Sequence, residues 1–226
     1  MNYAQLFETI KGYVENDFPN TSWTDSTGSG TATLTSTEQV NTFIQQAEQR
    51  VFNTVQLLDL RKNVTGNCTA SNKYLSVPTD WLATFSIAVI DGDGNYEYLL
   101  NKDVNFIRQS FPNPNDEGLP THYAYFDQNS FILGPTPDDD YEVELHYFYY
   151  PESIVTAGTS WLGDNFDSVL LYGSLLEAYT FMKGEQDVIT EYQKRYDDAM
   201  IMLKQLGEGK NRQDMYRSGQ VRYPVR

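Results

Sequence analysis

Apolar residues recur every three or four positions in two segments of the N-terminal part of the chain. They form one stripe along residues 2–15 and another along residues 36–60, and this spacing predicts two amphipathic helices. The second helix is expected to begin at Ser36, because Gln39 follows it at the spacing of a capping box. Its opposite face carries glutamine and asparagine but few charges, which suits packing against a neighbour.

The same helical spacing returns near the C-terminus. Residues 166–183 and 187–206 each carry apolar positions in register, and Gly184 lies between them. So short a break predicts that the two helices pack as an antiparallel hairpin. Gly173 lies inside the first of these helices. It either lets another helix approach closely or simply costs about 1 kcal/mol relative to alanine.

The spacing of apolar residues changes to every second position between residues 62 and 151, which predicts β-strands. In the clearest strand, 141–149, the apolar and tyrosine side chains point to one face, and His146 lies mid-strand on the mixed face, where a structural role is expected. A brief helix is expected at 102–111. The candidate strands are 63–69, 73–77, 85–90, 96–100, 122–127, 130–133 and 141–149.

Residues 19–36 are rich in serine, threonine and glycine and contain few apolar side chains. This composition predicts a loop or flexible linker. A Gly-Ser-Gly sequence in this segment does not predict a phosphate-binding loop, because no lysine follows it and no strand is predicted before it.

Together these patterns predict an α+β fold. A long-helix bundle is expected from residues 1–60 and 161–206, with main helices at about 36–60, 166–183 and 187–206. An antiparallel β-domain, residues 61–160, is inserted between its two parts. Residues 207–226 are expected to form an extended basic arm that stays extended until it meets a partner.

Charge is unevenly distributed along this acidic chain. The net charge is −15, yet the arm holds five basic and two acidic residues, which gives it +3 and leaves −18 for residues 1–206. A surface this acidic repels phosphate backbones and disfavours general nucleic-acid binding. A basic arm on an acidic body indicates docking on an acidic partner, either a sister copy or a ring above it.

Aromatic residues make up 14% of the chain, with 17 tyrosines, which is typical of protein interfaces and of aromatic β-cores. No run of eighteen apolar residues occurs, so no membrane-spanning helix is expected. Residues 1–15 lack the apolar core of a secretory signal.

Candidate chemistry is sparse. Cys68 is the single cysteine, which excludes an internal disulfide and a cysteine-rich metal site, and His122 and His146 are the only possible imidazole bases. We expect Cys68 to be a small semi-buried side chain. Paired carboxylates of a glycosidase stay open as an alternative, since sequence does not show which carboxylates meet in space, but no motif favours them.

One segment resembles the start of a calcium-binding loop. Asp91, Asp93 and Asn95 have the right spacing, but Tyr96 replaces the glycine at position six and Lys102 replaces the glutamate at position twelve. A hairpin turn explains these residues better. We therefore expect no catalytic residue, no metal site and no cofactor.

Several segments resemble one protein family. Residues 35–51 (TSTEQVNTFIQQAEQRV) are similar to the first long helix of head-to-tail adaptor proteins of tailed bacteriophages, also called head-completion, connector or neck proteins. Residues 119–154 match that family's tyrosine-rich hairpin, its Gly-Pro-x-Pro turn at 134–137 and its tyrosine-ended strand. Residues 170–178 (LLYGSLLEA) and 192–199 match its C-terminal helices. The resemblance covers most of residues 35–206.

This resemblance implies a structural virion protein, made in the host cytoplasm and placed in the neck of the particle. It implies a homo-oligomeric ring, a dodecamer, that connects the portal of the head to tail or nozzle proteins. DNA would pass through an acidic lumen without specific binding. In this family the C-terminal segment reaches onto the portal, which makes the arm the expected portal-binding site. Its candidate residues are Arg212, Tyr216, Arg217, Arg222, Tyr223 and Arg226.

The sequence leaves two alternatives open. The first is another phage structural subunit of the tail tube or baseplate, although tube subunits usually lack a pair of long C-terminal helices. The second is a carbohydrate-binding module that stacks sugars on aromatic side chains. Trp23, Trp81 and Trp161 do not gather in one predicted strand, which disfavours this reading.

Overall fold

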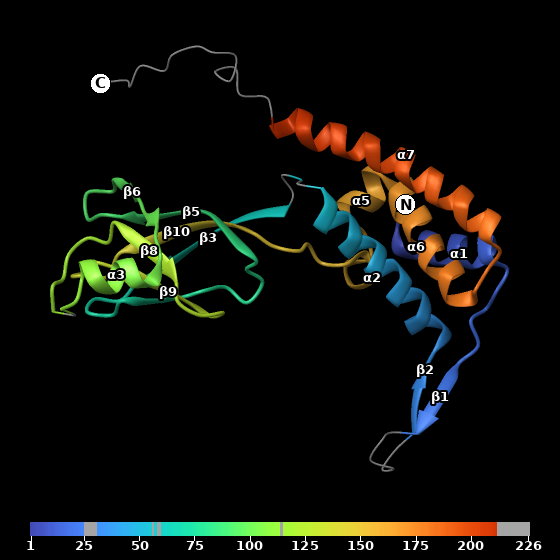
Figure 1. The fold of residues 1–226 in the computed structure, drawn as a ribbon, viewed down its shortest axis with the longest axis horizontal. Coiled ribbons are helices and arrows are strands. Elements are labelled where there is room, and N and C mark those ends of the chain that lie inside the picture. The colour runs from blue at the N-terminus through green and yellow to red at the C-terminus, as the bar shows by residue number, and fades with distance from the viewer. Residues whose placement is uncertain (25–30, 56, 58–59, 114, 212–226) are drawn as a thin grey trace. The chain divides into compact units, whose positions relative to one another are not determined.

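The computed structural model describes residues 1–24, 31–55, 57, 60–113 and 115–211. The chain divides into two compact units (Figure 1). Met1–Leu58 and the residues from Pro151 onward form the helical unit, and Asp59–Tyr150 form the β unit. The α+β class predicted from the sequence is confirmed. No helix among the described residues is both long enough and apolar enough to cross a membrane.

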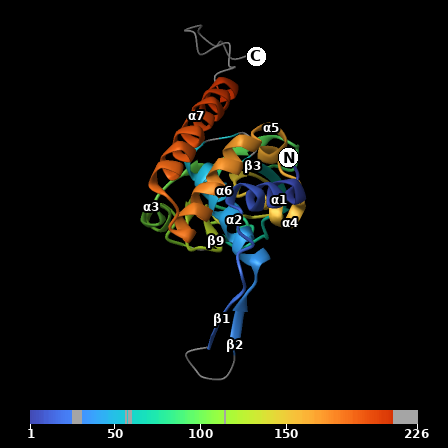
Figure 2. The same cartoon turned by 90° about the vertical axis from the view of Figure 1, so that its right-hand side faces the viewer.

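The helical unit is built around one central helix, α6. Figure 2 shows α6 between α7 and the N-terminal helices, and α6 packs against α1, α2, α5 and α7. Because neighbours surround α6, its buried residues are not confined to one face. The helices are α1 (Tyr3–Val14), α2 (Ser36–Thr54), α4 (Ile154–Ala157), α5 (Trp161–Asn165), α6 (Asp167–Met182) and α7 (Gln186–Asn211).

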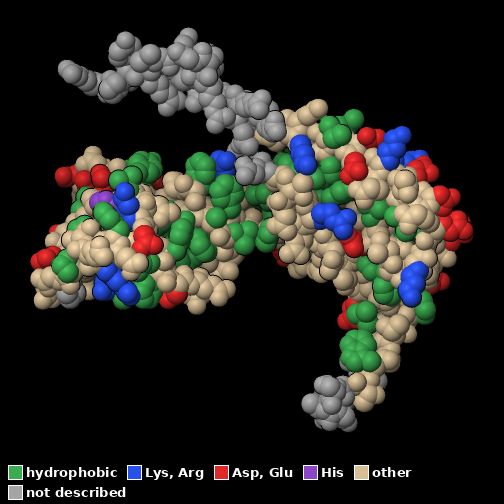
Figure 3. All heavy atoms as spheres, in the orientation of Figure 1, with side chains coloured by type: hydrophobic (Ala, Val, Ile, Leu, Met, Phe, Trp, Pro, Cys, Tyr) green, Lys and Arg blue, Asp and Glu red, His purple; other side chains and the backbone are tan. Residues whose placement is uncertain are grey.

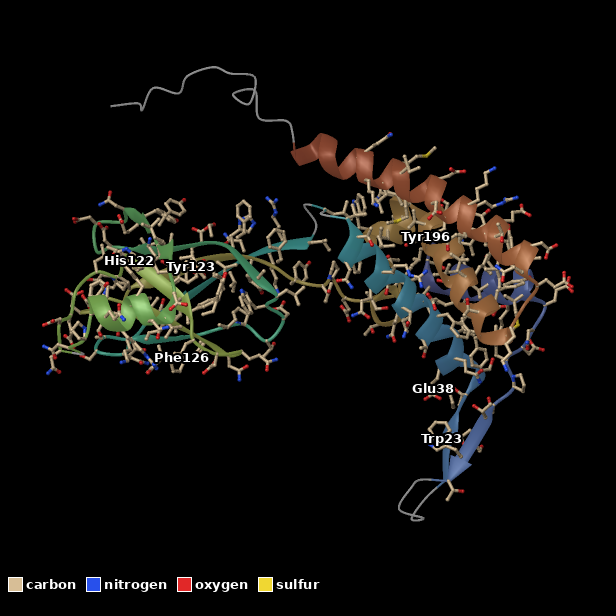
Figure 4. All side chains as sticks on the ribbon, in the orientation of Figure 1. Trp23, Glu38, His122, Tyr123, Phe126 and Tyr196 are labelled. Carbon is tan, nitrogen blue, oxygen red and sulfur yellow. The ribbon has the colours of Figure 1, made fainter. Side chains whose placement is uncertain are left out.

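Gly173 lies at a close approach of three helices. A Cβ atom at this position would lie 3.0 Å from the Ala47 Cβ on α2 and 3.2 Å from the Tyr196 Cε2 on α7. Figure 4 shows Tyr196 among the packed helices. The prediction that Gly173 admits a close neighbour is confirmed, and the predicted α6–α7 hairpin is confirmed by their packing.

Two helix ends differ from the sequence prediction. α2 ends at Thr54 and not at residue 60. The apolar pattern continues beyond this end, since Val55 and Leu57 are buried although they lie outside the helix. α7 continues through Gly207 to Asn211, where the sequence predicted an end at 206. A helix tolerates an interior glycine at a cost of about 1 kcal/mol, and Gly207 is itself buried.

The N-terminus of α2 also differs in detail. Thr35, and not Ser36, is the N-cap, and its hydroxyl accepts a hydrogen bond from the Glu38 backbone N–H at 3.3 Å. The Glu38 carboxylate in turn accepts a hydrogen bond from the Thr35 backbone N–H at 2.8 Å, which lowers the pKa of Glu38. The capping box predicted from the sequence is therefore present, shifted by one residue.

The prediction of a loop or flexible linker at residues 19–36 is wrong for Thr21–Thr24 and Thr31–Leu34, and residues 25–30 lie outside the described residues. The strands β1 (Thr21–Thr24) and β2 (Thr31–Leu34) pair as an antiparallel hairpin in which Thr21 lies opposite Leu34. Threonine is β-branched and favours strands, and that preference outweighs the loop-like composition of the segment. The Gly-Ser-Gly sequence lies outside the described residues.

The β unit contains two four-stranded sheets with a buried core between them and a smaller buried cluster beside the short helix Val104–Ser110. One sheet has the order β3-β10-β5-β6 and the other β4-β9-β8-β7. All neighbours are antiparallel except β7 and β8. The elements are β3 (Arg61–Asn67), β4 (Tyr74–Ser76), β5 (Ala83–Ile90), β6 (Tyr96–Tyr98), β7 (Leu100–Asn101), α3 (Val104–Ser110), β8 (His122–Tyr125), β9 (Ser130–Gly134) and β10 (Glu142–Phe148).

The alternation predicted for the last strand is confirmed. Val143, Leu145 and Tyr147 of β10 are buried against Tyr123 and Phe131 from the other sheet. The predicted strand 96–100 is instead divided between β6 and β7, which belong to different sheets.

The segment that resembles a calcium-binding loop forms the turn between β5 and β6, as predicted. The Asp91 carboxylate accepts hydrogen bonds from the backbone N–H groups of Asp93 at 2.9 Å and Asn95 at 2.8 Å. The Asn95 side chain also donates to it, and these hydrogen bonds lower the pKa of Asp91. The carboxylate is satisfied by its own turn.

Candidate assembly surfaces

The residues predicted to bind a portal lie outside the described residues. These are Arg212, Tyr216, Arg217, Arg222, Tyr223 and Arg226. The structure describes the chain as far as Asn211, the last residue of α7. The helical unit therefore contributes the helix from which the arm continues.

The C-terminal part of α7 carries exposed apolar side chains. Met202 is 65% exposed, and Leu206 lies one helical turn further on and is also exposed. Ile201 is exposed beside them, whereas Leu203 is fully buried. α7 has 26 residues and its partner α6 has 16, so α7 is the longer helix of this hairpin. These side chains form an apolar strip directly before the arm.

The β1–β2 hairpin projects from the helical bundle (Figure 2). Its base is fixed at the start of α2, where the Ser36 backbone N–H donates to the Asn20 Oδ1 at 2.9 Å. The buried Gln39 side chain, expected from the sequence to complete a capping box, instead donates to the Pro19 carbonyl at 3.0 Å. All four residues of β1 are exposed, and Trp23 is 52% exposed (Figure 4). The hairpin therefore presents a large aromatic side chain on an anchored support.

The outer face of the β3-β10-β5-β6 sheet carries an aromatic cluster. The Arg61 guanidinium lies 4.2 Å from the centre of the Phe85 ring and 5.3 Å from that of Phe148. Phe85 also contacts the His146 ring edge to face at 4.9 Å between ring centres. Phe85 is about half exposed, so the cluster is open to solvent on one side. His146 packs on an aromatic ring, in keeping with the structural role expected of it.

Two exposed tyrosines flank this cluster on β6. Tyr96 and Tyr98 stack with ring centres 6.4 Å apart, and Tyr98 is 64% exposed. The negative charge of Glu144 raises the pKa of Tyr96. The Asn63 amide donates to the Glu144 Oε1 at 2.7 Å. Tyrosines with one apolar face and one polar tip suit a protein interface that is only partly dry.

Acidic side chains gather on the helical unit where α7 begins (Figure 3). Glu185, Asp187 and Glu191 are exposed there. Hydrophobic side chains appear on the surfaces of both units in the same view. The described surface thus combines acidic regions with apolar and aromatic ones, which is the combination expected of a protein that assembles.

In the part of the chain that the structure describes, the surroundings of the thiol, the possible metal ligands and two of the tryptophans give no sign of a chemical site. The Cys68 thiol is buried, and burial raises its pKa. Among the described residues, no group of three or more His, Cys, Asp or Glu side chains is placed to hold a metal ion. Trp81 packs against Phe131 and Trp161 against Phe166, so the tryptophans do not form one sugar-binding platform.

The hairpin and its tryptophan are the surface that sequence reasoning missed. The available signal was the run of β-branched and aromatic residues at Thr21–Thr24. The aromatic cluster was equally hidden, because it depends on which strands are neighbours in the sheet.

Comparison with known proteins identifies the family. The family model described as SU10 adaptor protein matches residues 1–223, which is nearly the whole chain. Among curated protein sequences no significant match is found. The match includes the N-terminal helix and the hairpin segment, which the resemblance found by sequence analysis did not cover. The chain belongs to the SU10 adaptor protein family, a family of phage head-tail adaptors.

Proposed function

We propose that this chain forms a ring, a dodecamer, between the portal of a phage head and its tail or nozzle proteins. Membership of the adaptor family carries the proposal. Exposed apolar and aromatic side chains on α7, on the β1–β2 hairpin and on the outer sheet face support it, since a ring subunit needs separate surfaces for its neighbours.

The basic arm is the proposed portal-binding element. Its +3 charge contrasts with the −18 of the rest of the chain, and it continues from the apolar strip of α7. Arginine and tyrosine are the residue types that most often dominate interface affinity. DNA is proposed to pass through an acidic lumen that repels it. A basic channel wall in an assembled ring would contradict this last point.

The arm is tested by deleting residues 213–226 and mixing the protein with portal rings. Negative-stain microscopy and mass analysis should show full-length chains joined to portals as rings and truncated chains left as folded monomers. A matched control replaces Arg212, Arg217, Arg222 and Arg226 by lysine, which keeps the charge but removes bidentate hydrogen bonding. Normal portal binding by the truncated chain would show that the arm is not the docking element.

A further inference from the structure

On one side of the β unit, each of the two sheets ends in a strand with an edge left unpaired by the described strands. β3 and β4 are the end strands of their sheets, and each pairs with one described strand only. Natural proteins protect such edges with lysine, proline or bulges against pairing with other chains. The stretch Asn63–Asn67 of β3 has no charged residue and no proline, and it pairs with β10 in regular register. The free edge of β3 is therefore suited to accept a further strand.

An apolar groove of about 280 Å³ lies along this edge. It opens between β3 and β4, where the core of the β unit reaches the surface, and Gly66 leaves open space above its own Cα. A strand added to β3 would place alternate side chains into this groove. Its apolar lining consists of Val64, Leu75, Val77, Pro78, Val143 and Leu145.

The β1–β2 hairpin has the complementary properties. It is a two-stranded sheet without a third described strand, and a ribbon of this kind is marginally stable in water by itself. Neither strand contains a charged residue, so no charge protects its edges. Trp23 exposes a large apolar surface that a partner would bury. The hairpin therefore offers a free strand edge and an exposed aromatic side chain.

We propose that the β1–β2 hairpin of one copy pairs with the β3 edge of the next copy and that Trp23 fills the groove. The inference rests on the ring of the proposed function. A hairpin that meets a groove is a contact between two different surfaces, and repetition of such a contact closes into a ring when the rotation allows it. The hairpin belongs to the helical unit and the groove to the β unit, so each copy carries one hairpin to insert and one groove to receive a hairpin.

The test is a cysteine pair, Thr21→Cys with Ser76→Cys, in the full-length chain, which keeps Trp23 and the apolar lining of the groove. Oxidised samples, both the concentrated free protein and complexes with portal rings, are analysed on denaturing gels. We expect a ladder of covalently joined chains. The matched control pairs Thr21→Cys with Ser86→Cys, which lies on the outer face of the β3-β10-β5-β6 sheet in the lining of a different pocket. The native Cys68 is buried and should not contribute to the ladder.

Microscopy of the same samples separates this inference from the proposed function. Rings on portals without a ladder would overturn the hairpin contact and leave the ring standing. A ladder in the free protein without rings on portals would support the contact and overturn the proposed function. Crosslinks confined to single chains, or the absence of both ladder and rings, would overturn the contact.

Two further variants test the occupant of the groove. Trp23→Ser should weaken ring formation at least tenfold, whereas Trp23→Phe should retain most of it. The side chain is exposed in the single chain, so both variants should fold normally. Equal assembly by the serine variant and the native chain would overturn the proposal. If Val221→Cys in the arm crosslinks to Ser76→Cys and Thr21→Cys does not, the arm fills the groove and the proposal is wrong.

Discussion

Replacing Glu48 by alanine should destabilise the helical unit. Glu48 lies on α2, is 3% exposed, and its Oε1 accepts a hydrogen bond from the Ile154 backbone N–H at 2.9 Å. Ile154 is the first residue of α4, close to where the chain re-enters the helical unit after Tyr150. The carboxylate therefore joins two segments that are 106 positions apart in the sequence.

The expected loss of stability is the sum of the contributions that the substitution changes. A buried N–H without a partner costs about 1–3 kcal/mol, and the one lost methylene group, Cγ, costs about 0.8 kcal/mol. Alanine recovers a few tenths of a kcal/mol of helix propensity. Glu48→Ala should thus lower the free energy of unfolding by about 1.5–3.5 kcal/mol, measured by urea denaturation. Glu48→Gln keeps the acceptor oxygen and should lie within about 1 kcal/mol of the native chain.

The pH dependence gives a second check. Burial raises the pKa of Glu48 above its ordinary value of 4.5, so the folded chain holds this proton more tightly than the unfolded chain. Stability from this group is therefore complete below pH 4.5 and is lost as pH rises through the raised pKa. The Glu48→Gln side chain does not ionise, so this variant does not lose stability in this way. Its free energy of unfolding, relative to that of the native chain, should therefore rise between pH 4 and 7. Equal stability of the alanine and native chains, or equal damage by alanine and glutamine, would refute the reasoning.

Two further predictions concern helix packing and the thiol. Gly173→Val should destabilise the helical unit by about 1–3 kcal/mol because its side chain meets Ala47 and Tyr196, whereas Gly12→Ala on α1, where a Cβ meets nothing within 4 Å, should stabilise it by up to about 1 kcal/mol. Thermal denaturation measures both, and a stable valine variant would contradict the close packing. The Cys68 thiol should react with a thiol reagent only on unfolding, because burial raises its pKa and blocks access. Fast reaction of the folded chain would show that the site is open.

Much of the candidate surface depends on the tertiary structure. Arg61, Phe85 and Phe148 come from three strands, and only the sheet order brings them together. The sequence showed Phe85 and Phe148 as strand residues but not as neighbours. The groove beside β3 likewise requires two edges from two sheets, which no local pattern encodes.

The sequence by itself determined the element types, because spacing of apolar residues is a local property. It predicted the helices that became α1, α6 and α7, the buried face of β10 and the turn at Asp91. It also predicted that Gly173 permits close packing. Local patterns failed where long-range contacts decide. The apolar residues Val55 and Leu57 suggested a longer α2, but they are buried outside any helix. Thr21–Thr24 form a strand because they pair with Thr31–Leu34.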